Sequence, residues 1–119
     1  MDTAPVVFDR SAALERVGGD VALLREIAGL FLDELPALRG RIGDSVRDRD
    51  ARTLEEAAHC LKGSVGNFGL NAAFQAAFDL EVLARSQALD GIEERHARLE
   101  SALDALVLAL ADVAGERES

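Results

Sequence analysis

The sequence predicts an all-α protein: an antiparallel four-helix bundle with a short extra helix at the N-terminus. The chain has no Trp or Tyr and few β-branched residues, while Ala, Leu, Glu and Arg, which are strong helix formers, dominate. Apolar residues also recur every three or four positions in segments separated by short connections. Short connections between helices favour antiparallel neighbours, and this gives the bundle.

The first two helices have clear start signals. Asp9 can cap a short helix that stops at the glycine pair 18–19, and Asp20 can cap the next helix. Pro36 should interrupt and kink this second helix, because its ring removes one backbone donor. A polar, charged stretch at 43–50 then leads into the third helix. The second helix has apolar residues at helical spacing: Leu24, Ala28, Phe31, Leu35, Leu38 and Ile42.

Three further helices complete the bundle. The third should run to about Val65, a glycine-containing turn should occupy 66–71, and the fourth should end near Ser86. Asp90 and Glu93 have the spacing of a capping box that opens the last helix. The apolar seam of that helix is Ile92, His96, Leu99, Leu103, Leu106, Leu110 and Val113.

Length and charge limit the class of protein. The 119 residues suit a single domain at 1–119, with a core at about 9–114 and a flexible C-terminal tail at 115–119. The net charge of −9 disfavours nucleic acid and anionic membranes as partners. The single cysteine, Cys60, suits a reducing compartment, and no apolar run is long enough to span a bilayer. With no secretory signal at the start, we expect a cytoplasmic protein, either a monomer or a weak dimer.

The third helix has an unusual exposed face. Its predicted core stripe is Leu54, Ala57, Ala58, Leu61 and Val65. At about 100° per residue, His59 lies opposite that stripe and should face solvent. The same face holds Arg52, Glu55, Lys62, Gly63 and Gly66.

Two neighbours of His59 suggest chemistry. Gly63 costs an exposed helix about 1 kcal/mol relative to Ala, so it indicates a flat spot where another backbone can approach, unless the helix is simply ending. Lys62 is the only lysine among 13 basic residues. Its ammonium can neutralise a phosphoryl group on the imidazole, although an ordinary solvated lysine is the alternative.

A residue of the fourth helix should face His59. If the intervening turn centres near residue 70, antiparallel packing puts Glu81 opposite His59. A carboxylate there can accept the Nδ1–H and leave Nε2 unprotonated as a nucleophile. On spacing alone, an ordinary surface glutamate remains the alternative. The predicted core stripe of this helix is Ala73, Ala76, Ala77, Leu80 and Ala84.

The segment 58–69, Ala-His-Cys-Leu-Lys-Gly-Ser-Val-Gly-Asn-Phe-Gly, closely resembles the signature of histidine phosphotransfer (HPt) domains of two-component phosphorelays. The motif His-x-Leu-Lys-Gly-Ser followed by Asn-x-Gly is specific. The resemblance covers about 9–110 and includes Gly18-Gly19-Asp20, Leu23-Leu24, Phe31, Pro36, Leu80-Glu81 and Ala84-Arg85.

The resemblance implies a four-helix bundle and a role for each matching residue. His59 corresponds to the phosphorylated histidine, Lys62 to the lysine near the phosphoryl group, and Glu81 to the residue that hydrogen-bonds the imidazole. The chain would be a phosphocarrier rather than an enzyme, passing phosphate from one receiver-domain aspartate to another. It would bind no cofactor itself, because the receiver supplies Mg²⁺. We expect the receiver to contact Arg52, Glu55, Gly63, Gly66, Phe74 and Phe78.

The two phenylalanines have other possible roles. Phe74 and Phe78 lie on the Glu81 side of the fourth helix, away from its alanine stripe. They can form an apolar patch beside His59 for docking or self-association, or they can contact a neighbouring helix of the bundle.

Two other functions remain open. A di-metal bundle enzyme is suggested by Glu-x-x-His spacing at 56–59 and 93–96. The helical angles disfavour this metal site, because the glutamates and histidines do not share an inward face. Glu56 also has another possible role, since Thr53 with Glu56 fits a capping box. The other function is an HPt-like module that docks receivers without phosphotransfer. His59, Lys62 and Gly63 disfavour it, since a docking surface needs no nucleophile.

Overall fold

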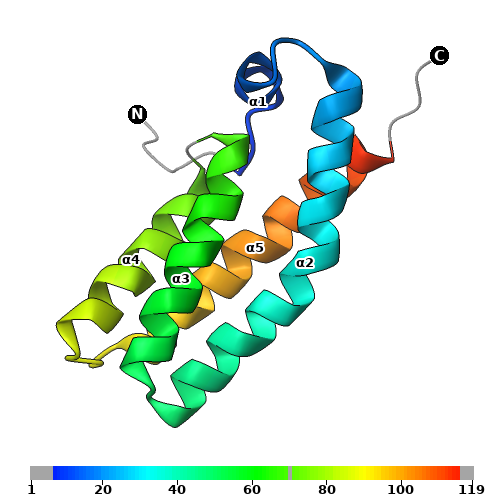
Figure 1. Cartoon of the computed structure of the whole chain (residues 1–119). Helices are drawn as coiled ribbons and strands as arrows, with labels where there is room; N and C mark the ends of the chain where they lie inside the picture. The colour runs from blue at the N-terminus through cyan, green and yellow to red at the C-terminus, as the bar shows by residue number, and fades with distance from the viewer. Residues whose placement is uncertain (1–6, 70, 116–119) are drawn as a thin grey trace.

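A computed structural model describes residues 7–69 and 71–115 (Figure 1). All regular secondary structure in these ranges is helical, so the predicted all-α class is confirmed. The described elements are α1 (Arg10–Arg16), α2 (Val21–Asp48), α3 (Ala51–Val65), the 3₁₀ helix η1 (Gly66–Phe68), α4 (Ala72–Ser86) and α5 (Ile92–Ala114).

The four longer helices pack around one apolar core. Helix α3 packs against α2 and α4, and α5 packs against the same two helices from the other side. Successive members of this group run in opposite directions in Figure 1, while α1 lies at the end of the group, against η1. Large core side chains that are at most 1% exposed are Leu24, Ile42, Leu54, Leu61, Phe68, Leu80, Ile92, Leu99, Leu103, Leu106 and Leu110. No helix among the described residues is long and apolar enough to cross a membrane.

Side-chain caps fix where the helices start. The carboxylates of Asp9 and Asp20 accept backbone N–H groups three residues on, at 3.1 and 3.0 Å, which confirms the two predicted caps. Asp50 caps α3 in the same way at 3.1 Å, and Asn71 caps α4 at 2.9 Å. Each such cap typically stabilises a helix by about 1 kcal/mol.

Helix α2 is longer than the sequence predicted. It continues without a break through Pro36 to Asp48, so the predicted interruption at Pro36 and the polar connection at 43–50 are wrong. Burial explains the difference, because Ser45 and Val46 are only 4% and 6% exposed and belong to the packed face of the helix. Packing on this face offsets the backbone donor that Pro36 removes. The connection to α3 is reduced to Arg49, in left-handed conformation, and Asp50.

The helix start predicted at Asp90 is also different. Gly91, with φ of +80°, occupies the N-cap position of α5, and no side chain caps the helix. The capping box of Asp90 and Glu93 is therefore wrong. The buried side chain of Ile92 sets the helix start one residue later than an Asp90 cap would, and Glu93 pairs instead with Arg49 at 2.8 Å.

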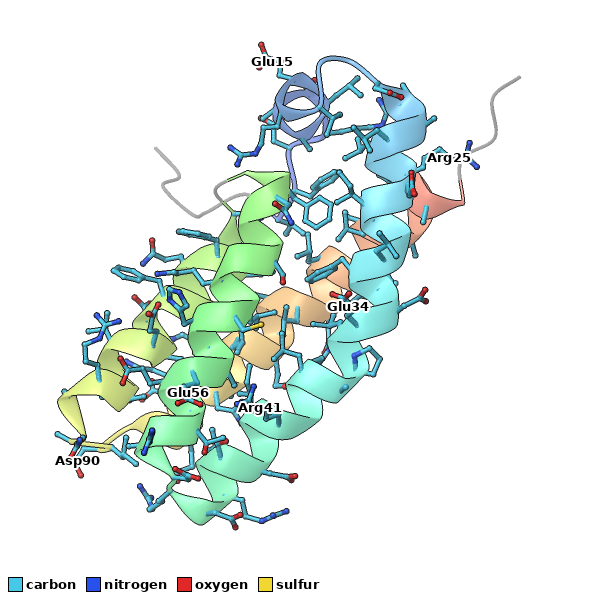
Figure 2. The ribbon with its side chains drawn as sticks, viewed as in Figure 1. Glu15, Arg25, Glu34, Arg41, Glu56 and Asp90 are labelled. Atoms are coloured by element: carbon cyan, nitrogen blue, oxygen red, sulfur yellow. The ribbon has the colours of Figure 1, made fainter. Side chains whose placement is uncertain are left out.

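The capping box predicted from Thr53 and Glu56 is also wrong, because another residue occupies the N-cap position. Asp50, rather than Thr53, caps α3. Glu56 lies within 3.5 Å of Arg41 and 3.6 Å of Arg52. Figure 2 shows Glu56 and Arg41 facing each other from α3 and α2.

The turn between α3 and α4 is held by one buried amide. The side-chain nitrogen of Asn71 donates to the carbonyls of Gly69 and Val65, at 3.1 and 3.4 Å. Gly69 has φ of +91°, which favours glycine, and Phe68 is only 1% exposed. Phe31 packs edge-on against Phe68 with ring centroids 5.4 Å apart. These contacts fix how α4 returns along α3.

Candidate functional site

The site lies on the α3–α4 pair. The five residues of the predicted α3 stripe are all buried, which confirms that face as core. His59 lies on the other side of α3, with its side chain 69% exposed. On α4, Ala73, Ala77, Leu80 and Ala84 are buried as expected, while Ala76 is only partly buried.

Glu81 is a buried acid beneath this exposed histidine. Its side chain is 2% exposed. One carboxylate oxygen, Oε2, lies 2.8 Å from Nδ1 of His59 and 2.8 Å from Nη2 of Arg85, while Oε1 forms an ion pair with Nζ of Lys62 at 2.8 Å. Burial alone would raise the pKa of Glu81, but the contacts with Lys62 and His59 outweigh it and lower that pKa. Glu81 is therefore ionised at neutral pH.

The ionised carboxylate determines which ring nitrogen of His59 carries the proton. A carboxylate can only accept hydrogen bonds. Because Oε2 of Glu81 lies 2.8 Å from Nδ1, that nitrogen must donate. In the neutral ring Nε2 is then unprotonated, with its lone pair available at the surface. The site can thus supply a nitrogen nucleophile without a preceding proton transfer.

Lys62 is held in place by two contacts in this structure. Its side chain is 22% exposed, with Nζ at Oε1 of Glu81 and 5.1 Å from the centroid of the Phe78 ring. The second contact has the geometry of a cation–π interaction. Phe78 itself is 40% exposed. The phenylalanine thus supports the lysine while leaving apolar surface beside His59.

The two glycines of the predicted site differ. Among the residues that the structure describes, a Cβ added to Gly63 would meet nothing within 4 Å outside its own helix, so the surface one turn after His59 is open. A Cβ on Gly66 would lie 3.5 Å from the ring of Phe74, which is partly buried and packs against the core. Only Gly63 therefore keeps a clear approach to the imidazole, whereas Gly66 accommodates Phe74.

The two charged residues of the predicted docking face have different surroundings. Arg52 has a side chain that is 91% exposed. Glu55 instead accepts a hydrogen bond from Nε of Arg85 at 2.9 Å across α3 and α4. Sequence reasoning missed this role of Arg85. Its position four residues after Glu81 could have indicated only the contact with Glu81, since it places both side chains on one face of a helix.

The residues of the di-metal alternative do not converge. In residues 7–69 and 71–115, no group of three or more His, Cys, Asp or Glu side chains could hold a metal ion. Glu56 and Glu93 pair with arginines at the surface. His96 is partly buried in α5, as the seam predicted, with Nε2 3.3 Å from Glu100.

The fold and the site together define a helical domain that presents an oriented, exposed imidazole. The family model for the Hpt domain matches residues 26–109, which is more than half of the chain, so this chain belongs to the Hpt domain family. Neither the search of curated proteins nor the search of solved structures gives a match. Hpt domains carry out histidine phosphotransfer in two-component phosphorelays, as phosphocarriers rather than enzymes.

Proposed function

We propose that this protein is a phosphorelay intermediate that accepts a phosphoryl group on His59 from a receiver-domain aspartate and passes it to another receiver. The contact between Nδ1 of His59 and buried Glu81 at 2.8 Å carries the proposal. It leaves Nε2 as the nucleophile on an imidazole that a second protein can reach.

The transfer needs no net movement of protons. The Nε2 lone pair of His59 attacks the phosphorus of the aspartyl phosphate. The Nε2–P bond forms while the P–O bond to the aspartate breaks, and its electron pair leaves with the carboxylate. The phosphorylated ring keeps its Nδ1 proton and becomes positive, and Glu81 stabilises that charge at 2.8 Å. In the onward step, a carboxylate oxygen of the next receiver attacks phosphorus and the bonding pair returns to Nε2.

The chain's own contribution to charge stabilisation is Lys62. Its ammonium lies one turn from His59, close enough on the helix to approach phosphoryl oxygens as a point charge. Phosphoryl transfer depends mainly on positioning and electrostatics. The partner receiver supplies Mg²⁺, and this chain binds no cofactor of its own.

The receiver docks on the exposed side of α3. Gly63 gives its backbone room, and Arg52 and Phe78 lie on the same side of the molecule as His59. A largely apolar groove between α2 and α3 gives the receiver a second surface to contact along α3. Its lining residues are Phe31, Glu34, Leu35, Ala37, Leu38, Arg41, Cys60 and Ser64. The same proposal places the protein in the cytoplasm as a monomer or weak dimer.

The chain offers its own control for a test of His59. The parental protein, His59→Gln and His96→Gln are each mixed with a panel of phosphorylated receiver domains. The readout is acid-labile, alkali-stable phosphate on the Hpt chain. His96 is the only other histidine in the sequence, so its substitution controls for losing an imidazole elsewhere.

The expected result is label on the parent and on His96→Gln, and none on His59→Gln. Label retained by His59→Gln would overturn the assignment of the phosphoacceptor. Receiver binding without label on any variant would instead favour a docking module that does not transfer phosphate.

A further inference from the structure

Arg85 joins two carboxylates that belong to different helices. Its Nη2 donates to Oε2 of Glu81 at 2.8 Å, and its Nε donates to Oε2 of Glu55 at 2.9 Å. Glu81 is one turn before Arg85 on α4, whereas Glu55 is one turn before His59 on α3. A closed set of contacts therefore runs from His59 through Glu81 and Arg85 to Glu55, and back to α3.

The contact with Arg85 falls on the oxygen that orients the imidazole. Oε2 of Glu81 receives both Nδ1 of His59 and Nη2 of Arg85, while Lys62 pairs with the other oxygen. A carboxylate can rotate about its last bond, and two donors on one oxygen restrict that rotation. Arg85 thus restrains the atom that sets the tautomer of His59.

Phosphorylation makes this restraint more important. In the proposed function, the ammonium of Lys62 moves toward the phosphoryl oxygens and away from Oε1 of Glu81. Glu81 is 2% exposed, so once Lys62 has moved away, the cations left in contact with its carboxylate are the positive ring of His59 and the guanidinium of Arg85. Unlike Lys62, Arg85 stays in contact with Glu81 when His59 is phosphorylated, because Glu55 holds the Nε of its guanidinium.

An ordinary surface ion pair would contribute little, and Arg85 is 57% exposed. Two features distinguish it from such a pair. One of its partners is a buried carboxylate, and its guanidinium is fixed at two nitrogens rather than one.

We propose that Arg85, anchored by Glu55, is a positioning residue that holds Glu81 against Nδ1 of His59. Arg85 does not touch the reacting atoms, and it acts through Glu81. The phosphotransfer part of this inference rests on the proposed function, whereas the effect on the imidazole does not.

The test uses Arg85→Gln, Arg85→Lys and a matched control, Arg47→Gln. Arg47 is a similarly exposed arginine on α2 that also pairs with two carboxylates, Asp44 and Asp48. The first readout is the ¹⁵N spectrum of the His59 ring at alkaline pH, which reports the fraction of each neutral tautomer. The second readout is the initial rate of phosphotransfer from a phosphorylated receiver.

In Arg85→Gln, the Nδ1–H tautomer of His59 should fall and transfer should slow by about tenfold, the effect of losing one charged hydrogen bond. Arg85→Lys should lie between the parent and Arg85→Gln, because an ammonium keeps the charge but not the two-pronged contact. Arg47→Gln should match the parent in both readouts.

The role of Glu55 is tested by a double-mutant cycle. Glu55→Ala alone should shift the tautomer in the same direction as Arg85→Gln, by a smaller amount. In the Arg85→Gln background it should add nothing, since Glu55 acts through Arg85. Additive effects would overturn the anchoring role of Glu55.

The two proposals fail in different ways. If the parent is labelled but Arg85→Gln keeps the parental tautomer fraction and transfer rate, the positioning role of Arg85 is wrong and the proposed function stands. If the tautomer shifts in Arg85→Gln but no receiver labels the parent, the positioning role stands and the phosphotransfer function is wrong.

Discussion

Nδ1 of His59 lies 2.8 Å from Oε2 of Glu81, although the two side chains have opposite exposure. The imidazole is 69% exposed and the carboxylate 2% exposed. The pair thus connects the surface of the bundle to its interior. A buried acid offers a fixed hydrogen-bond acceptor, because its rotation is restricted and no water competes for it. An exposed ring, in turn, leaves Nε2 free for a second protein.

The ionisation of Glu81 should be visible in the pH dependence of stability. Its pKa in the folded protein lies below the ordinary value of 4.5 because its contacts with Lys62 and His59 outweigh burial. The resulting stability is present above the ordinary pKa and is lost as the pH falls through the lowered one. At pH 7, Glu81→Gln should lower the free energy of unfolding by about 1–3 kcal/mol.

The measurement is chemical denaturation of the parent and Glu81→Gln across the acid range. The difference between the two proteins should shrink below about pH 4.5. Comparing the two proteins cancels the contribution of the other carboxylates. A difference that stayed constant into acid would show that Glu81 does not titrate as a stabilising anion.

Gly63 and Gly40 allow a matched test of the open surface beside His59. Both are helical glycines at which an added Cβ meets no atom of the described residues within 4 Å, apart from those of its own helix. Leucine at either position should preserve the fold or stabilise it by up to about 1 kcal/mol. Only Gly63→Leu should also obstruct the receiver, at a cost of about 1–3 kcal/mol from overpacking the interface. That corresponds to a loss of receiver affinity of about 5- to 150-fold.

Thermal unfolding and titration of an unphosphorylated receiver measure the two effects separately. Parental affinity in Gly63→Leu would remove the reason for a glycine at this position. Equal losses in Gly63→Leu and Gly40→Leu would mean that the effect is not local to the site.

The sequence predicted the placement of His59 and Glu81 better than the end of α2 and the start of α5. The spacing of apolar residues placed His59 on the exposed face of α3, and antiparallel pairing placed Glu81 opposite it, because both inferences depend on helix geometry alone. The continuation of α2 beyond Gly43 was missed because its residues look polar, and only tertiary packing buries Ser45 and Val46.

Two features could not be predicted from residue types and their spacing: the start of α5 and the contact between Arg85 and Glu55. The capping box at Asp90 failed because the left-handed conformation of Gly91 starts α5 without a side-chain cap. The contact between Arg85 and Glu55 depends on how two exposed side chains cross from α4 to α3. Local spacing pairs Arg85 with Glu81, but it contains no information about the partner on the other helix.

Asn71 should make a measurable contribution to stability. Its side chain is buried, caps α4 through the N–H of Phe74, and donates to the carbonyls of Gly69 and Val65. Asn71→Ala removes these bonds and should lower the free energy of unfolding by about 1–2 kcal/mol. Asn71→Asp keeps the cap but places a carboxylate oxygen against the carbonyls of Gly69 and Val65, so it should destabilise at least as much as Asn71→Ala.

Urea denaturation of the three proteins measures these differences. Unchanged stability in Asn71→Ala would mean that the α3–α4 turn is held by the packing of Phe68 alone. Because this turn sets the alignment of α3 with α4, Asn71→Ala should also weaken the contact between His59 and Glu81. The ¹⁵N spectrum of the His59 ring reports that change.

Two variants separate the effect of the charge of Lys62 from the effect of its contact with the Phe78 ring. Lys62→Ala removes the cation and should slow phosphotransfer by about 10- to 100-fold, the effect of losing one charged hydrogen bond to the phosphoryl group. Phe78→Leu keeps the lysine but removes the ring that lies 5.1 Å from Nζ. Since an exposed cation–π contact contributes only about 0.5–1 kcal/mol, this variant should lose little stability.

Phe78→Leu also removes one of the two contacts that hold Lys62 and leaves its ion pair with Glu81. Once receiver binding is saturated, transfer to His59 should therefore be as fast as in the parent or faster. Single-turnover transfer at saturating receiver removes differences in affinity and isolates the chemical step. Parental rates in Lys62→Ala would show that the lysine serves only to neutralise Glu81. Slow transfer in Phe78→Leu at saturating receiver would show instead that the Phe78 ring aligns Lys62 for the reaction. The contact between Lys62 and Phe78 in the unphosphorylated protein would then be the arrangement that supports transfer.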